Sequence, residues 1–471
     1  MDTMRKFDTN VQTLKYKVLR EVSRQAWLGN ESFDVFNEIA KEVVKKDENP
    51  KSCCIYKDRA IVAERIKIAL GGDKTNPNVI EVIDIACDEC PVAGHVVTDL
   101  CRGCIAHKCA DACKPNAIHF DDEQMAHIDK HKCVECGKCA KVCPYSAITN
   151  FKRPCEKACK VNAIHMAEEG EAEIDNAKCI SCGACVYQCP FGATVDKSFV
   201  VDVIHLIQKS EENTKYKVHA IVAPSIASQF KYTKLTKIIR AIKELGFYAV
   251  REVALGADKV AAKEAKELEE KGFLTTSCCP AFVQYVRNSF PMLADNISHN
   301  LSPMGEMAKF IKDEDPSCKV VFIGPCTAKK AEIRQEPLKD YVDYVLTFEE
   351  LQALIDGKNI DVEHLEPLEM EDASYFGRIF ARGGGVAEAV GEALKEQGSN
   401  FEYKPIACEG IDKCKTALLK ASKNVLPFNI IEGMACEGGC VGGAGCLTHD
   451  DKYRGIIDEY GKEAKKKTIL E

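Results

Sequence analysis

The first 80 residues contain three segments whose apolar side chains recur at helical spacing. The segments read VQTLKYKVLREVSRQAWL (11–28), DVFNEIAKEVVKK (34–46) and RAIVAERIKIAL (59–70). Residues three and four positions apart lie on one face of a helix, so each segment predicts an amphipathic helix. We expect residues 1–80 to form a helical segment that packs against the rest of the protein. The alternative is a docking site for a partner.

After about residue 215 the pattern changes to short apolar runs, typical of strands, that alternate with helical segments. The strand-like runs include YKVHAIVAP (216–224), FYAVREVALG (247–256), KVVFIGP (319–325), YVDYVLTF (341–348) and FNIIEGMA (428–435). Helical segments follow the first two runs, at residues 234–246 and 258–272. This alternation predicts an α/β domain over residues 215–450, with parallel sheets in two lobes. In such domains functional sites form at the carboxyl ends of the strands.

Composition narrows the function classes. The chain has 471 residues and a formal net charge of -8, and this acidic balance argues against a nucleic-acid partner. No apolar run is long enough to span a membrane, and the N-terminus lacks the apolar region of a signal peptide. We therefore expect a cytoplasmic protein. In that compartment 27 cysteines, an odd number, indicate metal or redox chemistry rather than disulfides.

The spacing of the cysteines favours iron–sulfur clusters over zinc. Residues 133–144 and 179–190 both read C-x2-C-x2-C-x3-C-P, the bacterial ferredoxin run in which three cysteines bind one 4Fe–4S cluster and the fourth binds its neighbour. Six cysteines recur 46 residues later: Cys109, Cys113, Cys133, Cys136, Cys139 and Cys143 correspond to Cys155, Cys159, Cys179, Cys182, Cys185 and Cys189. Residues 81–205 are therefore predicted to form a duplicated, ferredoxin-like α+β domain.

The exchange of fourth ligands between the repeats predicts four ligand sets. They are Cys113 with Cys133, Cys136 and Cys139; Cys159 with Cys179, Cys182 and Cys185; Cys101 and Cys104 with Cys109 and Cys143; and Cys87 and Cys90 with Cys155 and Cys189. The second repeat has no counterparts of Cys101 and Cys104, so its last set draws on the upstream CDECP. Those two upstream pairs could also exchange places. Alternatively, CDECP is only a loop, and three accessory clusters remain instead of four. Either row of clusters would conduct single electrons toward a catalyst.

Three motifs in the second half carry a resemblance to a known family. TTSCCPAF (275–282), IGPCTAKKAEI (323–333) and EGMACEGGCVGGAG (432–445) occur in this order. They resemble the three signature motifs of the iron-only (FeFe) hydrogenases, and the ferredoxin-like domain lies upstream as in that family. The resemblance covers about residues 80–450 and implies a catalytic domain that binds an H-cluster. This cofactor is a 4Fe–4S cluster linked to a diiron subcluster with carbonyl, cyanide and dithiolate ligands.

The resemblance also implies roles for individual residues. Cys279, Cys326, Cys436 and Cys440 would bind the 4Fe–4S part, with Cys440 bridging to the diiron part. Cys278 resembles the thiol that relays protons, a task that suits a group that titrates near neutrality. The groups that would surround the diiron part are Lys329, Pro224, Ser225 and Met434.

A surface-directed proton path is expected beyond Cys278. Glu264, Glu267 and Lys271 lie at i, i+3 and i+7 of one predicted helix face. They resemble the family's proton path, with Ser298 as a middle position. The alternative is an ordinary solvated helix face.

Several positions depart from the family pattern without removing a ligand. Phe282 stands where tryptophan is common, and Gly324 stands where methionine is usual. Met304 and Gly305 stand where glutamines are expected, and the third motif ends in GGAG. These departures resemble the divergent subgroup often called group B.

The resemblance implies an FeFe hydrogenase that converts two protons and two electrons reversibly to H2. Its expected partners are ferredoxin or a similar soluble carrier and the hydrogenase maturation proteins. The alternatives are a hydrogen sensor with slow turnover and an iron–sulfur assembly scaffold. Two further expectations concern the rest of the chain. Residues 451–471 form a C-terminal tail, whose end KEAKKKTILE (462–471) is expected to be a solvated helix or a frayed end. Among the remaining cysteines, Cys53 and Cys54 are expected to be buried structural thiols, burial is favoured over a redox role for Cys408 and Cys414, and Cys318 and Cys446 have no assigned role.

Overall fold

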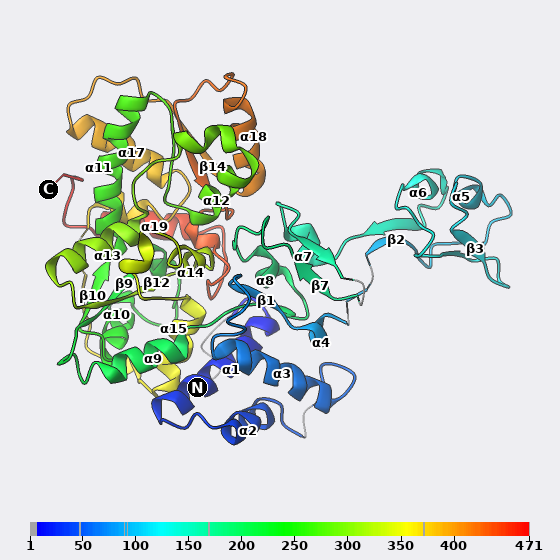
Figure 1. Ribbon diagram of the computed structural model, residues 1–471, viewed down its shortest axis with the longest axis horizontal. Coiled ribbons are helices and arrows are strands. Elements are labelled where there is room, and N and C mark those ends of the chain that lie inside the picture. The colour runs from blue at the N-terminus through cyan, green and yellow to red at the C-terminus, as the bar shows by residue number, and fades with distance from the viewer. Residues whose placement is uncertain are drawn as a thin grey trace.

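Three helices at the start of the chain cover one side of an α/β body in a computed structural model (Figure 1). The structure describes residues 7–46, 49–88, 90–91, 93–167, 170–370 and 373–470, so parts of the predicted helical segment and Glu471 lie outside it. The helices are α1 (Asn10–Trp27), α2 (Phe33–Val43) and α3 (Ile55–Ala69). Thr9 and Gln12 form a capping box that starts α1. Helix α1 packs along α15 (Phe348–Gly357) and buries Val18 and Val22, so it is part of the core.

A four-stranded parallel sheet forms the centre of the first lobe of the body. Its strand order is β10-β9-β12-β13, with β9 (Val218–Val222), β10 (Ala249–Glu252), β12 (Lys319–Ile323) and β13 (Tyr344–Leu346). All of β9 is buried, as is typical of a parallel strand covered on both faces. Helices and short turns of this lobe are α9 (Val200–Lys209), η1 (Pro224–Ser228), α10 (Leu235–Glu244), α13 (Pro303–Glu314), α14 (Ala328–Glu332), η3 (Leu338–Asp340) and η4 (Val362–His364).

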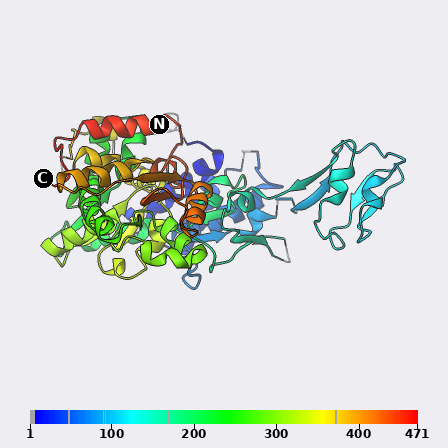
Figure 2. The same cartoon turned by 90° about the horizontal axis from the view of Figure 1, so that it is seen from above.

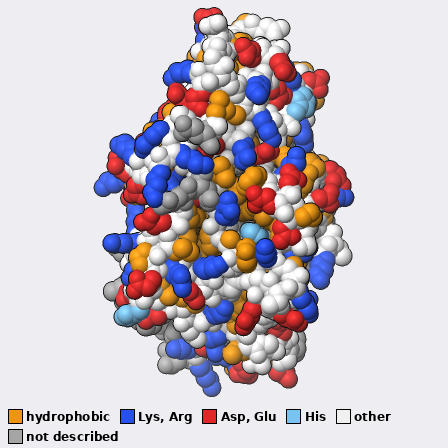
Figure 3. Space-filling view, turned by 90° about the vertical axis from the view of Figure 1, so that its left-hand side faces the viewer, with side chains coloured by type: hydrophobic (Ala, Val, Ile, Leu, Met, Phe, Trp, Pro, Cys, Tyr) orange, Lys and Arg blue, Asp and Glu red, His pale blue; other side chains and the backbone are white. Residues whose placement is uncertain are grey.

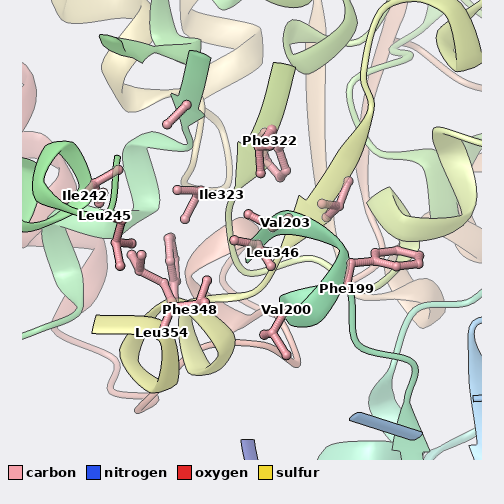
Figure 4. Close-up of a cluster of buried hydrophobic side chains, with 14 of the residues drawn as sticks. Phe199, Val200, Val203, Ile242, Leu245, Phe322, Ile323, Leu346, Phe348 and Leu354 are labelled. Carbon is pink, nitrogen blue, oxygen red and sulfur yellow. The ribbon is translucent and has the colours of Figure 1, made fainter. Parts of the chain in front are cut away.

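The core of this lobe joins elements that lie far apart in the chain. Figure 4 shows Phe199, Val200 and Val203 beside side chains of the sheet and of two other helices. The partners labelled there are Ile242, Leu245, Phe322, Ile323, Leu346, Phe348 and Leu354. Helix α9 therefore packs into the α/β body, and the predicted domain boundary near residue 205 falls inside this helix.

A second parallel sheet, of three strands, forms the other lobe. Its order is β11-β15-β14, with β11 (Leu274–Thr275), β14 (Pro405–Glu409) and β15 (Ile430–Met434). Around it lie α11 (Val253–Lys271), α12 (Pro280–Ser289), η2 (Pro291–Asn296), α16 (Tyr375–Ile379), α17 (Gly385–Glu396), α18 (Ile411–Ala421), η5 (Cys440–Gly442) and α19 (Tyr453–Lys462). The predicted α/β class with two parallel-sheet lobes is confirmed.

Two local predictions in these lobes are wrong. The run 247–256 was expected to be one strand, but the strand ends at Glu252 and α11 begins at Val253. The reason is that Val253, Ala257 and Ala261 are buried at helical spacing. The described part of the segment 462–471 is not a solvated helix or a frayed end: α19 ends at Lys462, and beyond it Ala464 and Ile469 are buried and the backbone N–H of Ile469 donates to Glu396.

The cysteine-rich region consists of two modules, and one is inserted into the sequence of the other. The inserted module lies farther from the α/β body and is called the outer module, and the module beside the body is called the inner module. The outer module contains β2 (Gly94–Val97), α5 (Lys108–Asp111), β3 (Ile118–Phe120), β4 (Ala126–Ile128), α6 (Lys138–Val142) and β5 (Ile148–Phe151). The inner module contains β1 (Ile80–Val82), α4 (Asp84–Cys87), α7 (Pro154–Ala158), β6 (Ile164–Met166), β7 (Ala172–Ile174), α8 (Ala184–Gln188) and β8 (Thr194–Asp196). Strand β2 pairs with β5, and β1 pairs with β8.

This nesting explains the missing cysteines of the second repeat. Because β1 takes the place in the inner module that β2 takes in the outer one, Cys87 and Cys90 follow β1 as Cys101 and Cys104 follow β2. The outer module, residues 94–151, is therefore an insertion between the first strand of the inner module and its remainder. It projects away from the α/β body in both cartoon views (Figure 1 and Figure 2).

The opposite end of the molecule has a mixed surface. Acidic and basic side chains intermix there around a hollow with apolar side chains (Figure 3). This face therefore presents charge of both signs rather than a basic stripe. No helix of the described residues combines the length and apolar character that a membrane span requires.

Candidate metal centre

A cavity of about 90 Å³ lies where strands of the two lobes end. The three cysteine motifs and the segment after β9 all reach it: Cys278 and Cys279 follow β11, Cys326 follows β12, Cys436 follows β15, and Pro224 follows β9. The carboxyl ends of parallel strands are the usual position for a site in this fold class. Four sequence segments, far apart in the chain, thus contribute to one site.

Four of the cysteines in this cavity form one group: Cys279, Cys326, Cys436 and Cys440. Burial, followed by the neighbouring charges of Cys279 and Cys440, raises the pKa of Cys326 to about 12. Burial likewise raises the pKa of Cys440 to about 12, with Cys279 as the next cause. The pKa of Cys436 is raised well above its ordinary value by burial and, among other charges, by those of Cys326, Cys279 and Cys440. Thiols gathered in this way become thiolates only beside a compensating positive charge, such as a metal cluster supplies.

The predicted neighbours of the diiron group also line the cavity. They are Pro224, Ser225, Lys329 and Met434. Lys329 Nζ forms an ion pair with Glu332 at 2.7 Å and donates to the backbone oxygen of Cys278 at 3.4 Å. Burial lowers the pKa of Lys329, but the charge and hydrogen bond of Glu332, together with the charges of Cys326 and Cys278, outweigh it, and the net direction is upward. Ser225 Oγ is buried without a hydrogen-bond partner in the described part of the chain, so it is available to a bound group.

Two pockets of the outer module each gather four cysteines. Cys101, Cys104, Cys109 and Cys143 line one pocket, and Cys113, Cys133, Cys136 and Cys139 line the other. These are two of the predicted ligand sets, and Cys101 and Cys104 lie with Cys109 rather than with Cys155. Within the described residues no group of His, Cys, Asp or Glu is arranged to hold a single metal ion. Four cysteines around a pocket suit a larger cluster instead.

The inner module brings the other two sets together. Burial raises the pKa of Cys155 to about 11, with the charges of Cys189 and Cys87 as further causes. The pKa of Cys90 is raised by burial and by the charges of Cys87 and Cys189, against the lowering effect of Arg153. In the remaining set, burial raises the pKa of Cys185 well above its ordinary value. The charges of Cys182, Cys179 and Cys159 add to the shift, followed by that of Cys155 from the neighbouring set.

The inner module docks directly beside the cavity. Burial raises the pKa of Cys182 to about 11, and Cys279 is among the cysteines whose charges add to it. Thr327 Oγ1 donates to the backbone oxygen of Ser181 at 2.8 Å. A Cβ atom on Gly183 would lie 2.6 Å from Ala444 Cβ and 2.6 Å from Thr327 Oγ1. The absence of a side chain at position 183 is therefore what lets the two surfaces touch.

On its other side the cavity meets a row of polar side chains. Glu264 Oε1 accepts hydrogen bonds from Ser277 N at 3.2 Å and from Ser277 Oγ at 3.4 Å. Burial raises the pKa of Glu264 to about 7, against the lowering effect of the bonds from Ser277 and of the Ser298 hydroxyl. Ser298 Oγ in turn donates to Glu267 Oε2 at 3.4 Å. Glu267 forms an ion pair with Lys271 at 2.8 Å.

This row leads from the interior to the surface. The exposed fraction is 0% for Glu264 and 5% for Ser298, and the side chains of Glu267 and Lys271 are 13% and 28% exposed. Burial, followed by the negative charge of Glu264, raises the pKa of Cys278 well above its ordinary value. The structure thus places the four residues expected beyond Cys278 next to one another, from Glu264 in the interior to Lys271 at the surface.

Comparison with known proteins agrees with this arrangement. Residues 216–444 match the family "Iron only hydrogenase large subunit, C-terminal domain". Residues 132–192 match a "4Fe-4S double cluster binding domain", and residues 100–147 match a "4Fe-4S dicluster domain". The chain is an FeFe-hydrogenase-like protein. Its cluster domain lies N-terminal to the hydrogenase-like domain.

The relatives include hydrogenases and cytosolic Fe-S cluster assembly factors. Iron hydrogenase 1 of Clostridium pasteurianum is 32% identical over 258 residues, which are 44% of this chain and 45% of that protein, so the match spans about half of this relative. The periplasmic [Fe] hydrogenase large subunit of Nitratidesulfovibrio vulgaris is 29% identical over 70% of this chain and 87% of its own length. The cytosolic Fe-S cluster assembly factor NAR1 of Kluyveromyces lactis is 34% identical over 20% of each chain.

In this FeFe-hydrogenase-like protein the departures from the family pattern fit the side chains around them. A Cβ on Gly324 would lie 2.5 Å from the ring of Phe322, which lines the cavity. Phe322 thus uses the space that a longer side chain at position 324 would need. Similarly, a Cβ on Gly433 would lie 2.3 Å from the ring of Phe282. Met304 lines the cavity, whereas Gly305 faces Leu338. None of these departures removes one of the four grouped cysteines of the cavity.

A buried charge cluster beside the site could not be foreseen from the motifs. Lys330, next to Lys329, forms ion pairs with Asp196 at 2.8 Å and with Glu350 at 2.9 Å. Lys15 of α1 reaches the same Asp196 and also Glu349. All five side chains of the cluster are at least nine-tenths buried. The cluster joins the N-terminal helix, the inner module and the second cysteine motif.

The remaining cysteines differ in burial. Cys318, Cys408, Cys414 and Cys446 are buried, in keeping with a structural role. Cys53 is exposed and Cys54 is partly exposed, so the expectation of two buried thiols is wrong there. The reason is that both precede α3, whose first turn lies at the surface.

Proposed function

We propose that this chain catalyses the reversible reaction 2 H⁺ + 2 e⁻ ⇌ H2 at an H-cluster. The observation that carries the proposal is the position of the four-cysteine cavity, with the inner cluster module on one side and the row from Glu264 to Lys271 on the other. A hydrogenase needs an electron path and a proton path that meet at one point. The two paths reach the same cavity from different directions.

The residues present fit the H-cluster. Cys279, Cys326, Cys436 and Cys440 would hold its 4Fe–4S part, and the buried Ser225 hydroxyl and Lys329 would donate hydrogen bonds to the ligands of its diiron part. A Cβ on Gly443 would lie 2.6 Å from Pro325 O, so the chain approaches itself closely at this wall of the cavity. When bound, the diiron group supplies low-valent iron that activates hydrogen.

The protein's own contribution is the movement of protons. Cys278 Sγ exchanges a proton with the cavity on one side and with Glu264 on the other. Because the pKa of Glu264 lies at about 7, its carboxyl group both accepts and donates protons near neutrality. Ser298 and Glu267 continue the transfer to Lys271 and the surface. Glu264 and Ser298 are buried, so the inner part of this row is shielded from bulk water.

Electrons would enter through four 4Fe–4S clusters. The outer module would hold two of them in its two pockets, and the inner module would hold the other two. The projecting outer module is accessible to a soluble carrier such as ferredoxin (Figure 1). Installation of the diiron group would require the hydrogenase maturation proteins.

A second candidate function is an iron–sulfur assembly scaffold, favoured by the similarity to NAR1. A scaffold would need the four cysteines but no proton path. The row from Glu264 to Lys271 and the ion-paired Lys329 therefore favour the enzyme.

Hydrogen turnover by protein made together with the maturation proteins tests the proposal. The matched control is Cys440→Ala, which removes the predicted bridge to the diiron group. We expect the unsubstituted protein to exceed this control by at least about 100-fold with a small artificial electron donor. Equal rates in both proteins, each with its accessory 4Fe–4S clusters intact, would favour the scaffold.

A further inference from the structure

His299 lies at the outer end of the proton path and was not found from the motifs. Its ring Nδ1 is 2.7 Å from Glu267 Oε1 and 2.8 Å from Lys271 Nζ. Its backbone N–H donates to both carboxylate oxygens of Glu267 at 3.1 Å. The side chain is 71% exposed, against 13% for Glu267. The ring therefore has one nitrogen on the path while most of its surface faces solvent.

Two partners compete for the same nitrogen of this ring. In a neutral imidazole without a proton on Nδ1, that atom accepts from the Lys271 ammonium group. With a proton on Nδ1, it donates to Glu267. Both partners are in place at hydrogen-bond distance, so the ring can change between the two roles without a movement of the backbone.

The neighbouring groups leave His299 as the titratable contact between path and solvent. Helix α11 contributes Glu267 and Lys271, and Lys271 also donates to the backbone oxygen of Asp295 in η2. Asn300, which donates to Glu267 at 2.8 Å, is neutral. An ammonium group only donates hydrogen bonds, whereas a neutral imidazole carries a proton on one ring nitrogen and can accept one on the other. Lys271 is thus suited to orient the ring, and the ring to transfer the proton.

We propose that His299 exchanges protons between solvent and Glu267, as the mouth of the proton path; this rests on the proposed function. For uptake, Nε2 takes a proton from a buffer acid while Nδ1–H passes its proton to Glu267 Oε1. The bond to hydrogen broken at Nδ1 is matched by the one formed at Nε2, and the ring remains neutral after the transfer. For release, the same steps run in reverse.

The test compares His299→Asn with a matched control. Asparagine keeps the backbone hydrogen bonds and a side-chain amide donor but cannot titrate. The control is His364→Asn, because His364 is 82% exposed and contacts Asp361 at 2.8 Å in the other lobe. In dilute buffer near neutral pH, His299→Asn should lower turnover by about 10-fold or more, and added imidazole should restore it. His364→Asn should leave turnover unchanged.

A second readout does not depend on turnover. In protein with 4Fe–4S clusters but without the diiron group, a downward pH jump through neutrality should protonate Glu264, and its carboxyl C=O stretch reports this in the infrared. His299→Asn should slow the appearance of that band. Equal rates in His299→Asn and unsubstituted protein, here and in dilute-buffer turnover, would overturn the inference. Absence of turnover in matured unsubstituted protein, with a band that His299→Asn delays, would instead overturn the proposed function alone.

Discussion

Replacement of Cys278 by alanine is expected to remove more than about 99% of hydrogen turnover. Cys278 lines the cavity beside Cys279 but is not needed for the four-cysteine group, so the cofactor should still bind. What is lost is the thiol between the cavity and Glu264, whose charge acts on Cys278. A methyl group at this position cannot transfer a proton. The measurement is turnover per installed diiron group, counted from the carbonyl bands in the infrared.

The matched control for this prediction is Cys318→Ala. Cys318 is a buried cysteine in the core of the first lobe and belongs to none of the predicted ligand sets. This variant should lose some stability through a small cavity but keep its turnover per installed diiron group. Normal turnover in Cys278→Ala would show that protons reach the cavity by another route.

Gly183→Ala should separate the inner cluster module from the cavity. The new methyl group would meet Ala444 Cβ and Thr327 Oγ1 at 2.6 Å, so either the docking surface or the backbone must shift. Position 183 also has φ of 78°, where an L-residue is strained. Together these effects should lower the free energy of unfolding by about 2–5 kcal/mol. Thermal unfolding, followed by the visible absorbance of the clusters, measures this.

The internal repeat supplies a matched control for this variant. Gly137 occupies the same position in the outer module, 46 residues earlier, with φ of 70°. A methyl group there would meet only the end of His95, at 3.1 Å. Gly137→Ala should therefore show the backbone strain alone, about 1–2 kcal/mol. The difference between the variants isolates the docking contact, and equal losses would show that the contact at Gly183 contributes nothing.

The sequence predicted those parts of the site that depend on short, repeated spacing. The two ferredoxin runs place cysteines on a loop and a short helix, and their period of 46 residues fixes which cysteines correspond. The three hydrogenase motifs follow strands, so the rule for parallel sheets brings them to one cavity. These features require no knowledge of how distant segments pack.

Other features depend on packing between segments that no local pattern connects. The nesting of the two modules depends on the pairing of β1 with β8, which lies more than 100 residues later in the chain. Lys330 lies in a motif, but its partners Asp196 and Glu350 come from the inner module and α15. His299 follows a 3-10 turn, with no spacing relative to Glu267 that a sequence pattern would single out. Such contacts are set by tertiary structure.

An infrared spectrum of anaerobically matured protein, under argon and then under hydrogen, tests the central claim most directly. Carbonyl and cyanide ligands absorb in a region free of protein bands, so they report the diiron group alone. A diiron group that reacts with hydrogen should show these bands, and the bands should shift when hydrogen replaces argon. Bands that do not respond to hydrogen, or no bands after verified maturation, would contradict a hydrogen-reactive site.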